Sequence, residues 1–152
     1  MQLRTEVEID APAARVWEVL TDFTAYEQWN PFIARALGKL AEGQRLDLLL
    51  TLPDGSEHRV RPTVTRVEPQ RELRWVGRLW IPGLLEGEHF FQLETLDGSR
   101  TRLRHSEDFR GMLVRLLGRT LTQTGRAFVG MNHALKTRVE DSCAAGRSPA
   151  RK

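Results

Sequence analysis

The fold of this chain is decided by residues 112–140, which read MLVRLLGRTLTQTGRAFVGMNHALKTRVE. Apolar side chains recur in this stretch at steps of three, four and seven, which predicts one long helix with a single apolar stripe. The stripe consists of Leu117, Leu121, Phe128, Leu135 and Val139. Gly125 and Asn132 lie on the same stripe, and Gly118 lies close to it.

Three glycines, Gly118, Gly125 and Gly130, fall inside this predicted helix. A glycine in a helix costs about 1 kcal/mol relative to alanine, so their presence needs a reason. Either a strand approaches the helix closely at these positions, or the helix forms one wall of a cavity. The preceding part of the chain favours the cavity.

That preceding part begins with a strand at 3–9, where apolar and charged residues alternate. Asp10-Ala-Pro12 predicts the start of a short helix that ends near Asp22, and a second short helix is expected at 23–29. Further strands are predicted at 33–40, 46–52, 59–68, 72–80, 86–96 and 100–110. The short turns between them favour antiparallel neighbours.

A sheet with one apolar face must cover that face, and the C-terminal helix is the long element available to do so. We therefore expect an α+β fold. A curved antiparallel sheet wraps around the long C-terminal helix, and two short helices lie between the first and second strands.

Length and charge narrow the expectations further. The 152 residues predict a single domain at 1–141, followed by a flexible basic tail at 142–152. The formal net charge is +3, and the tail contributes Arg147, Arg151 and Lys152. The rest of the chain is therefore near neutral, and no nucleic-acid surface is predicted.

Neither a membrane-spanning run nor a secretion signal is found, so we expect no stable membrane insertion. The single cysteine, Cys143, cannot form an internal disulfide, and cytoplasmic localisation is expected. A homodimer is left open.

Several motifs resemble the START/Bet v 1-like superfamily, which is also called SRPBCC. In the first part of the chain they are Asp10-Ala-Pro12, Val16-Trp17, Asp22-Phe23 and Trp29-Asn30-Pro31. Later motifs look like its polyketide cyclase/dehydrase-related bacterial branch, namely Leu73-Arg-Trp75, Gly87-Glu-His89-Phe, His105-Ser-Glu107-Asp-Phe109-Arg-Gly111 and Met131-Asn132.

The resemblance extends to about Glu140. It implies a helix-grip fold with an apolar cavity between the sheet and the long helix. It does not imply one activity, because the superfamily includes carriers of lipids and hydrophobic small molecules, cyclases and aromatases, and hydrolases.

The last predicted hairpin, 86–110, carries the residues best suited to chemistry. A three-residue connection, Asp97-Gly98-Ser99, would pair Leu96 with Arg100 and place His89 opposite Glu107. Phe91 would then lie opposite His105, and these side chains would face inward together with Phe109. A buried carboxyl group beside imidazoles suits acid/base or hydrogen-bonding work, or it serves only to satisfy buried polar atoms.

The candidate catalytic residues are therefore His89, His105 and Glu107. Two histidines and one glutamate also resemble a facial metal triad, but no metal-binding spacing supports one. We expect neither a metal nor a cofactor.

Asn132 either forms a hydrogen bond with Asn30 or a backbone group, or it forms one with a ligand. The residues predicted to contact a ligand are Trp75, His89, Phe91, His105, Glu107, Phe109, Leu121, Gly125, Phe128 and Asn132.

Two functions from different classes follow. The first is a carrier or sensor that binds a hydrophobic or aromatic small molecule, such as a lipid or polyketide-like ligand, because Leu, Phe and Trp dominate the inner face. The second is an enzyme of the cyclase, aromatase or hydratase type that uses the inward histidines and glutamate. The apolar loop 81–85 is predicted to cover the cavity mouth; the alternatives are that it packs against the helix or a second subunit, or that it binds a partner.

Overall fold

The computed structural model describes residues 1–78 and 83–146. The first half of the chain contains β1 (Gln2–Ile9), α1 (Ala13–Thr21), η1 (Phe23–Ala25), α2 (Tyr26–Trp29), β2 (Ile33–Leu37), β3 (Asp47–Thr51), β4 (Glu57–Val60) and β5 (Thr63–Glu68). The second half contains β6 (Glu72–Arg78), β7 (Glu86–Asp97), β8 (Arg100–Arg110), η2 (Met112–Leu116) and α3 (Gly118–Ala145). The η elements are short 3₁₀ helices.

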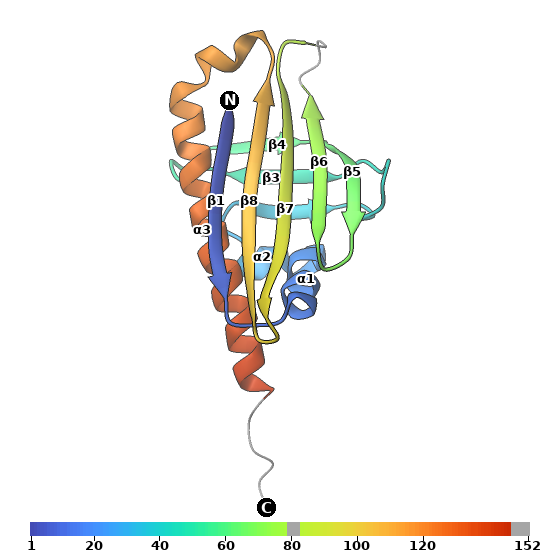
Figure 1. Ribbon diagram of the computed structural model, residues 1–152. Helices are drawn as coiled ribbons and strands as arrows, with labels where there is room; N and C mark the ends of the chain where they lie inside the picture. The colour runs from blue at the N-terminus through green and yellow to red at the C-terminus, as the bar shows by residue number, and fades with distance from the viewer. Residues whose placement is uncertain (79–82, 147–152) are drawn as a thin grey trace, which may run out of the picture.

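The strands form two antiparallel sheets that face each other (Figure 1). The larger sheet has five strands in the order β1-β8-β7-β6-β5, and the smaller has three in the order β2-β3-β4. In Figure 1 the strands of the smaller sheet run across those of the larger one. The α+β helix-grip architecture predicted from the sequence is confirmed.

The strand predicted at 59–68 is instead two strands, β4 and β5, and the break between them divides the sheet. Pro62 lies at this break, and proline has no N–H to donate to a neighbouring strand. An isolated bridge between Arg45 and Thr63 joins the two sheets within the described residues.

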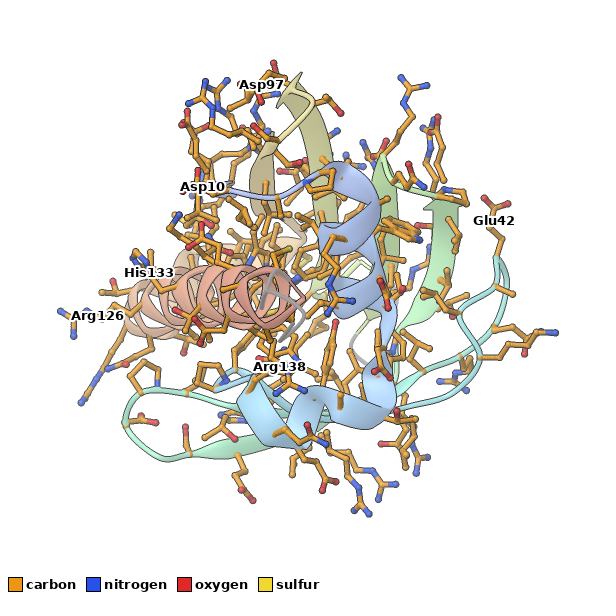
Figure 2. The ribbon with its side chains drawn as sticks, turned by 90° about the horizontal axis from the view of Figure 1, so that it is seen from below. Asp10, Glu42, Asp97, Arg126, His133 and Arg138 are labelled. Atoms are coloured by element: carbon orange, nitrogen blue, oxygen red, sulfur yellow. The ribbon has the colours of Figure 1, made fainter. Side chains whose placement is uncertain are left out.

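The helix α3 lies along the open side of the two sheets, beside β1 (Figures 1 and 2). Its inner stripe is buried, and this stripe comprises Leu121, Phe128, Leu135 and Val139. Arg126 and His133 point away from the sheets (Figure 2). The predicted stripe is therefore the face that packs on the core.

The ends of α3 differ from the prediction. The helix begins at Gly118, with Leu117 as its N-cap, because residues 112–116 form the separate 3₁₀ turn η2. Gly111 precedes this turn with a φ of +119°, and a Cβ there would lie 2.5 Å from the carbonyl oxygen of Leu84. At its other end α3 continues to Ala145, so the first four residues of the predicted tail are helical. Residues 147–152 of the predicted tail lie outside the described residues.

The glycines of α3 do not have the role predicted for them. A Cβ at Gly125 would have Leu3 of β1 as its nearest neighbour at 3.9 Å, and a Cβ at Gly130 would have Pro31 at 3.9 Å. Thr120 and Thr124 are the α3 residues that reach the cavity. A neighbour at 3.9 Å leaves room for a Cβ, so close packing, the alternative to a cavity wall, does not explain Gly125 and Gly130 either.

The start of α1 also differs. Pro12 is the N-cap residue rather than a first-turn residue, and no side chain caps the helix. Val16, Val19 and Leu20 are buried against the core that α1 shares with α3. None of the helices in the described ranges 1–78 and 83–146 is long and apolar enough to cross a membrane.

Two leucines of the C-terminal region allow a matched test of this packing. Leu135 is fully buried, whereas the side chain of Leu116 in η2 is 79% exposed. We expect Leu135→Ala to lower the free energy of unfolding by roughly 2–5 kcal/mol in urea denaturation, because it leaves a cavity in the core. Leu116→Ala should change it by about 0.5 kcal/mol or less. Equal effects of the two variants would contradict this arrangement of α3.

Candidate functional site

A cavity of about 620 Å³ lies between the two sheets. Strands β6, β7 and β8 form one wall and β3 and β4 form the opposite wall, while Thr120 and Thr124 of α3 contribute at one side. Much of the lining is apolar, and this part includes Leu48, Leu50, Leu52, Trp75, Leu85 and Phe109. The cavity was predicted between the sheet and the helix, but the division into two sheets makes the smaller sheet its main opposing wall.

The predicted site residues separate into two groups. Those that line the cavity are Trp75, His89, Glu107 and Phe109. The others do not line it and lie deeper in the core or along α3: Phe91, His105, Leu121, Gly125, Phe128 and Asn132. Contact of any of these residues with a ligand stays a prediction.

The pairing of β7 with β8 places the polar groups as predicted. His89 lies opposite Glu107, and Phe91 lies opposite His105. The predicted turn is wrong, however, because Asp97 pairs with Arg100 and the register shifts by a bulge between Thr95 and Asp97. The bulge supplies the extra residue that the longer turn was expected to supply, so the inward faces of both strands still coincide.

A chain of hydrogen bonds runs from β1 to the cavity through buried side chains. The amide nitrogen of Asn132 donates to Thr5 Oγ1 at 2.9 Å, and the amide oxygen of Asn132 lies 2.9 Å from His105 Nδ1. His105 Nε2 lies 2.9 Å from His89 Nε2. The last gap, from His89 Nδ1 to Glu107 Oε2, is 3.6 Å. The predicted bond of Asn132 to Asn30 or a backbone group is not found, because its partners are the side chains of Thr5 and His105. The alternative, a bond to a ligand, stays a prediction.

Burial determines the protonation states of the titratable side chains in this hydrogen-bond network. It lowers the pKa of His89 to about 3. It also lowers the pKa of His105 well below its usual value; the neighbouring His89 lowers it further, while the bond to Asn132 acts in the opposite direction. Burial raises the pKa of the Glu107 carboxyl to about 8. At neutral pH the two imidazoles are neutral and Glu107 is mainly a carboxylic acid, so His89 and Glu107 do not form an ion pair.

Aromatic rings hold the two imidazoles in place. The ring of His89 stacks on Trp75 with 4.9 Å between centroids and an interplanar angle of 10°. His105 stacks on Phe128 with 3.9 Å between centroids and an angle of 12°. Trp75 and Phe128 therefore limit the rotation of the histidines and shield them from water.

Glu107 has room because its neighbour on β7 is a glycine. Gly87 lies next to Glu107 at the cavity wall, and a Cβ at Gly87 would lie 2.6 Å from Glu107 Oε1. A larger residue there would displace the carboxyl group. Gly77, which pairs with Gly87 across β6 and β7, has open space where its Cβ would be.

Sequence reasoning missed His58 and the basic residues of the cavity lining. His58 pairs with Leu50 across β4 and β3, so both side chains lie on the face that lines the cavity. It was missed because the strand was expected to begin at Arg59, although the alternation of His58 with Val60 was a usable signal. The basic residues in the lining are Arg45, Arg59, Arg61 and Arg78. Arg59 and Arg61 contact Asp47, and Arg78 contacts Glu86.

The loop 81–85 is only partly described. Ile81 and Pro82 lie outside the described residues, so the predicted cover over the cavity mouth stays a prediction. Leu85 lines the cavity. The carbonyl groups of Gly83 and Leu84 accept hydrogen bonds from the backbone of Met112 and Leu113, which ties this loop to η2. Within residues 1–78 and 83–146, no group of three or more His, Cys, Asp or Glu side chains is placed to hold a metal ion.

Comparison with known proteins gives the following likenesses. Residues 1–140 match the family model described as polyketide cyclase / dehydrase and lipid transport. No curated protein sequence matches the chain. The structure is similar to the Zhui aromatase/cyclase from Streptomyces sp. R1128, with a TM-score of 0.81 and 19% identity over 98% of this chain and 99% of that one.

Two further structures show the same fold. A START superfamily protein from Mycobacterium smegmatis is 24% identical with a TM-score of 0.65, and the alignment covers 93% of this chain and 98% of that chain. The di-domain aromatase/cyclase StfQ from the steffimycin biosynthetic pathway is 17% identical with a TM-score of 0.66, over 95% of this chain and 53% of that chain. At these identities the likeness is one of fold.

The raised pKa of Glu107 predicts a pH-dependent effect of Glu107→Gln on stability. The unfolded chain ionises Glu107 near pH 4.5, whereas the folded chain holds the proton until about pH 8. The wild type therefore loses stability relative to the variant as the pH rises from 4.5 to 8. We expect Glu107→Gln to be near neutral at the lower pH and stabilising by about a few kcal/mol at the higher pH, since one pKa unit corresponds to about 1.4 kcal/mol.

Urea denaturation at the two pH values measures this difference. Glu57→Gln, which makes the same replacement at an exposed position of β4, is the matched control for a glutamate that burial does not affect. A difference between wild type and Glu107→Gln that stays constant with pH would show that Glu107 ionises freely in the folded protein.

Proposed function

This chain belongs to the polyketide cyclase/dehydrase and lipid transport family, and on that basis we propose that it binds a hydrophobic or aromatic small molecule in the cavity between its two sheets. The observation that carries the proposal is the cavity itself. Its volume of about 620 Å³ falls within the range of roughly 300–1,000 Å³ typical of small-molecule sites. Its lining is mostly apolar; His89 and Glu107 are polar groups on the wall formed by β7 and β8, and His58, Arg59 and Arg61 add polar groups at and beyond β4 on the opposite wall.

The position of those polar groups supports an oriented ligand. Leucines of β3 face Trp75 of β6 across the cavity, so an apolar body would be held between aliphatic and aromatic walls. His89 and Glu107 lie together on the neighbouring strands β7 and β8. His58 and Arg59 of β4 also line the cavity but are exposed to solvent, so a ligand with one polar group would place that group at His89 and Glu107 and its apolar part toward β3.

Gly77 provides a way to fill the cavity without disturbing the fold. It lies on the inward face of β6, and a Cβ added there meets no atom within 4 Å. We expect Gly77→Leu to weaken binding of the neutral hydrophobic fluorophore N-phenylnaphthylamine by roughly tenfold or more, because the new side chain occupies the ligand's space. Fluorescence titration measures the affinity.

Val76→Leu is the matched control for this experiment. Val76 is the adjacent residue of β6, and its side chain points to the opposite face of the sheet. This variant should bind the fluorophore as the wild type does. Equal binding by Gly77→Leu, with both variants folded, would place the probe outside the cavity and count against the proposal.

Native mass spectrometry of the purified protein, followed by denaturation and organic extraction, identifies the chemical class of any small molecule that co-purifies with it. A stoichiometric apolar passenger, released on denaturation, supports a carrier. A passenger that is wholly polar would contradict the proposed class. The same spectrum measures whether the chain is a monomer or the homodimer left open by the sequence.

A second candidate function, a cyclase-type enzyme, is favoured by one specific observation. Glu107 is a carboxylic acid at neutral pH, and its neighbour His89 is a neutral imidazole, so a proton donor and a proton acceptor line the same cavity. Glu107 can donate its proton to one atom of an enolisable ligand, while His89, with its low pKa, accepts a hydrogen bond from another.

Glu107→Gln separates the two candidates. With a linear poly-β-ketone as substrate, an enzyme should lose roughly 10²–10⁴-fold in turnover in this variant and keep most of its affinity, because the amide retains the shape of the side chain but not its acidic proton. Product analysis by liquid chromatography measures turnover. If the wild type leaves the poly-β-ketone unchanged, the enzyme candidate fails and the carrier stands.

A further inference from the structure

The hydrogen-bond chain behind the cavity has a direction, and Thr5 sets it. The Thr5 hydroxyl donates its single proton to the backbone carbonyl of His105 at 2.8 Å. Its oxygen is then free to accept a hydrogen bond, and it accepts one from the amide nitrogen of Asn132. The amide oxygen of Asn132 therefore points at His105.

This orientation fixes the tautomer of both histidines. The Asn132 oxygen can only accept, so His105 must carry its proton on Nδ1. A neutral imidazole has one N–H, which leaves a lone pair on His105 Nε2. His89 must then donate from its own Nε2, and the lone pair of His89 lies on Nδ1.

That lone pair faces a gap at the cavity wall. Its nearest acidic neighbour is Glu107, with 3.6 Å between His89 Nδ1 and Glu107 Oε2, which is too long for a hydrogen bond. Both residues line the cavity, so a ligand atom can reach both of them. A hydroxyl group suits the gap, because it donates to the His89 lone pair and accepts from the protonated Glu107 carboxyl.

We propose that Asn132 is a positioning residue that locks His89 as its Nε2–H tautomer through His105, and that the cavity thereby selects ligands bearing a phenolic, enolic or alcoholic hydroxyl group. The selection of a hydroxyl rests on the proposed binding function, whereas the tautomer lock does not. A ketone or a methyl ether of the same size lacks the proton that His89 Nδ1 requires, so the site disfavours it.

The lock is tested on the ligand-free protein by ¹⁵N NMR of the histidine side chains at neutral pH. We expect a protonated nitrogen at His105 Nδ1 and at His89 Nε2, and an unprotonated nitrogen at His89 Nδ1. In Asn132→Leu, His105 Nδ1 has no hydrogen-bond acceptor, so His105 can carry its proton on Nε2 instead. His89 Nε2 then accepts this proton in a hydrogen bond, and a signal from protonated His89 Nδ1 should appear. Met131→Leu, a volume-conserving change of the buried neighbour on α3, should leave the tautomers unchanged.

A wild-type spectrum with protonated His89 Nδ1 would overturn the lock, even if the Asn132 variant fails to fold. A spectrum of folded Asn132→Leu identical to that of the wild type would overturn the role of Asn132. Either result leaves the proposed binding function standing.

Hydroxyl selection is tested by calorimetric titration with three probes that share one ring system: naphthol, its methyl ether and naphthalene. We expect the wild type to bind naphthol roughly tenfold more tightly than the methyl ether, which corresponds to one hydrogen bond. In Asn132→Leu this preference should shrink toward equality, and in Met131→Leu it should persist. Equal wild-type affinities for the three probes would overturn the selection but not the cavity function. Absence of binding by all three would overturn both, while the NMR result still decides the lock.

Discussion

In β7 and β8, a slip of one residue in the pairing would turn every inward side chain of one strand to the outer face. The bulge between Thr95 and Asp97 prevents this, since it sets His89 opposite Glu107 and keeps the inward faces of the two strands together. The stacking of His89 on Trp75, the hydrogen-bond chain to Asn132 and the polar wall of the cavity all depend on that register. A local irregularity near the turn thus determines the chemistry at the other end of the hairpin.

Charge in this protein is separated by the larger sheet. On its outer face, Arg102 contacts Glu8 and Glu94, and Arg74 contacts Glu72 and Glu88, so opposite charges alternate across neighbouring strands. On its inner face the buried groups His89, His105 and Glu107 are mainly neutral at neutral pH, because burial disfavours the charged form of each. An inner face without net charge is compatible with an apolar cavity, whereas a buried ion would demand water or a counter-ion.

The elements of the fold and the inward face of the last hairpin could be predicted from the sequence, because alternation and helical periodicity are local signals. The division into two sheets could not be predicted, because it depends on how the chain turns at Pro62. The sequence pattern there is also compatible with a single bulged strand. The partners of Asn132 could not be predicted either, because Thr5 is distant in sequence and meets Asn132 only once β1 packs against α3. His58 was missed for a smaller reason, an incorrect strand boundary by two residues.

The paired glycines Gly77 and Gly87 differ in which side chains could replace them. This difference affects how the size and polarity of the cavity can vary between related proteins. A side chain at Gly87 would meet the carboxyl group of Glu107, so a change there also moves the polar group of the cavity wall. Gly77 faces empty space and is free to acquire a side chain. Evolution or design can therefore alter the size of the accepted molecule at one position while its polar recognition is inherited intact at the other.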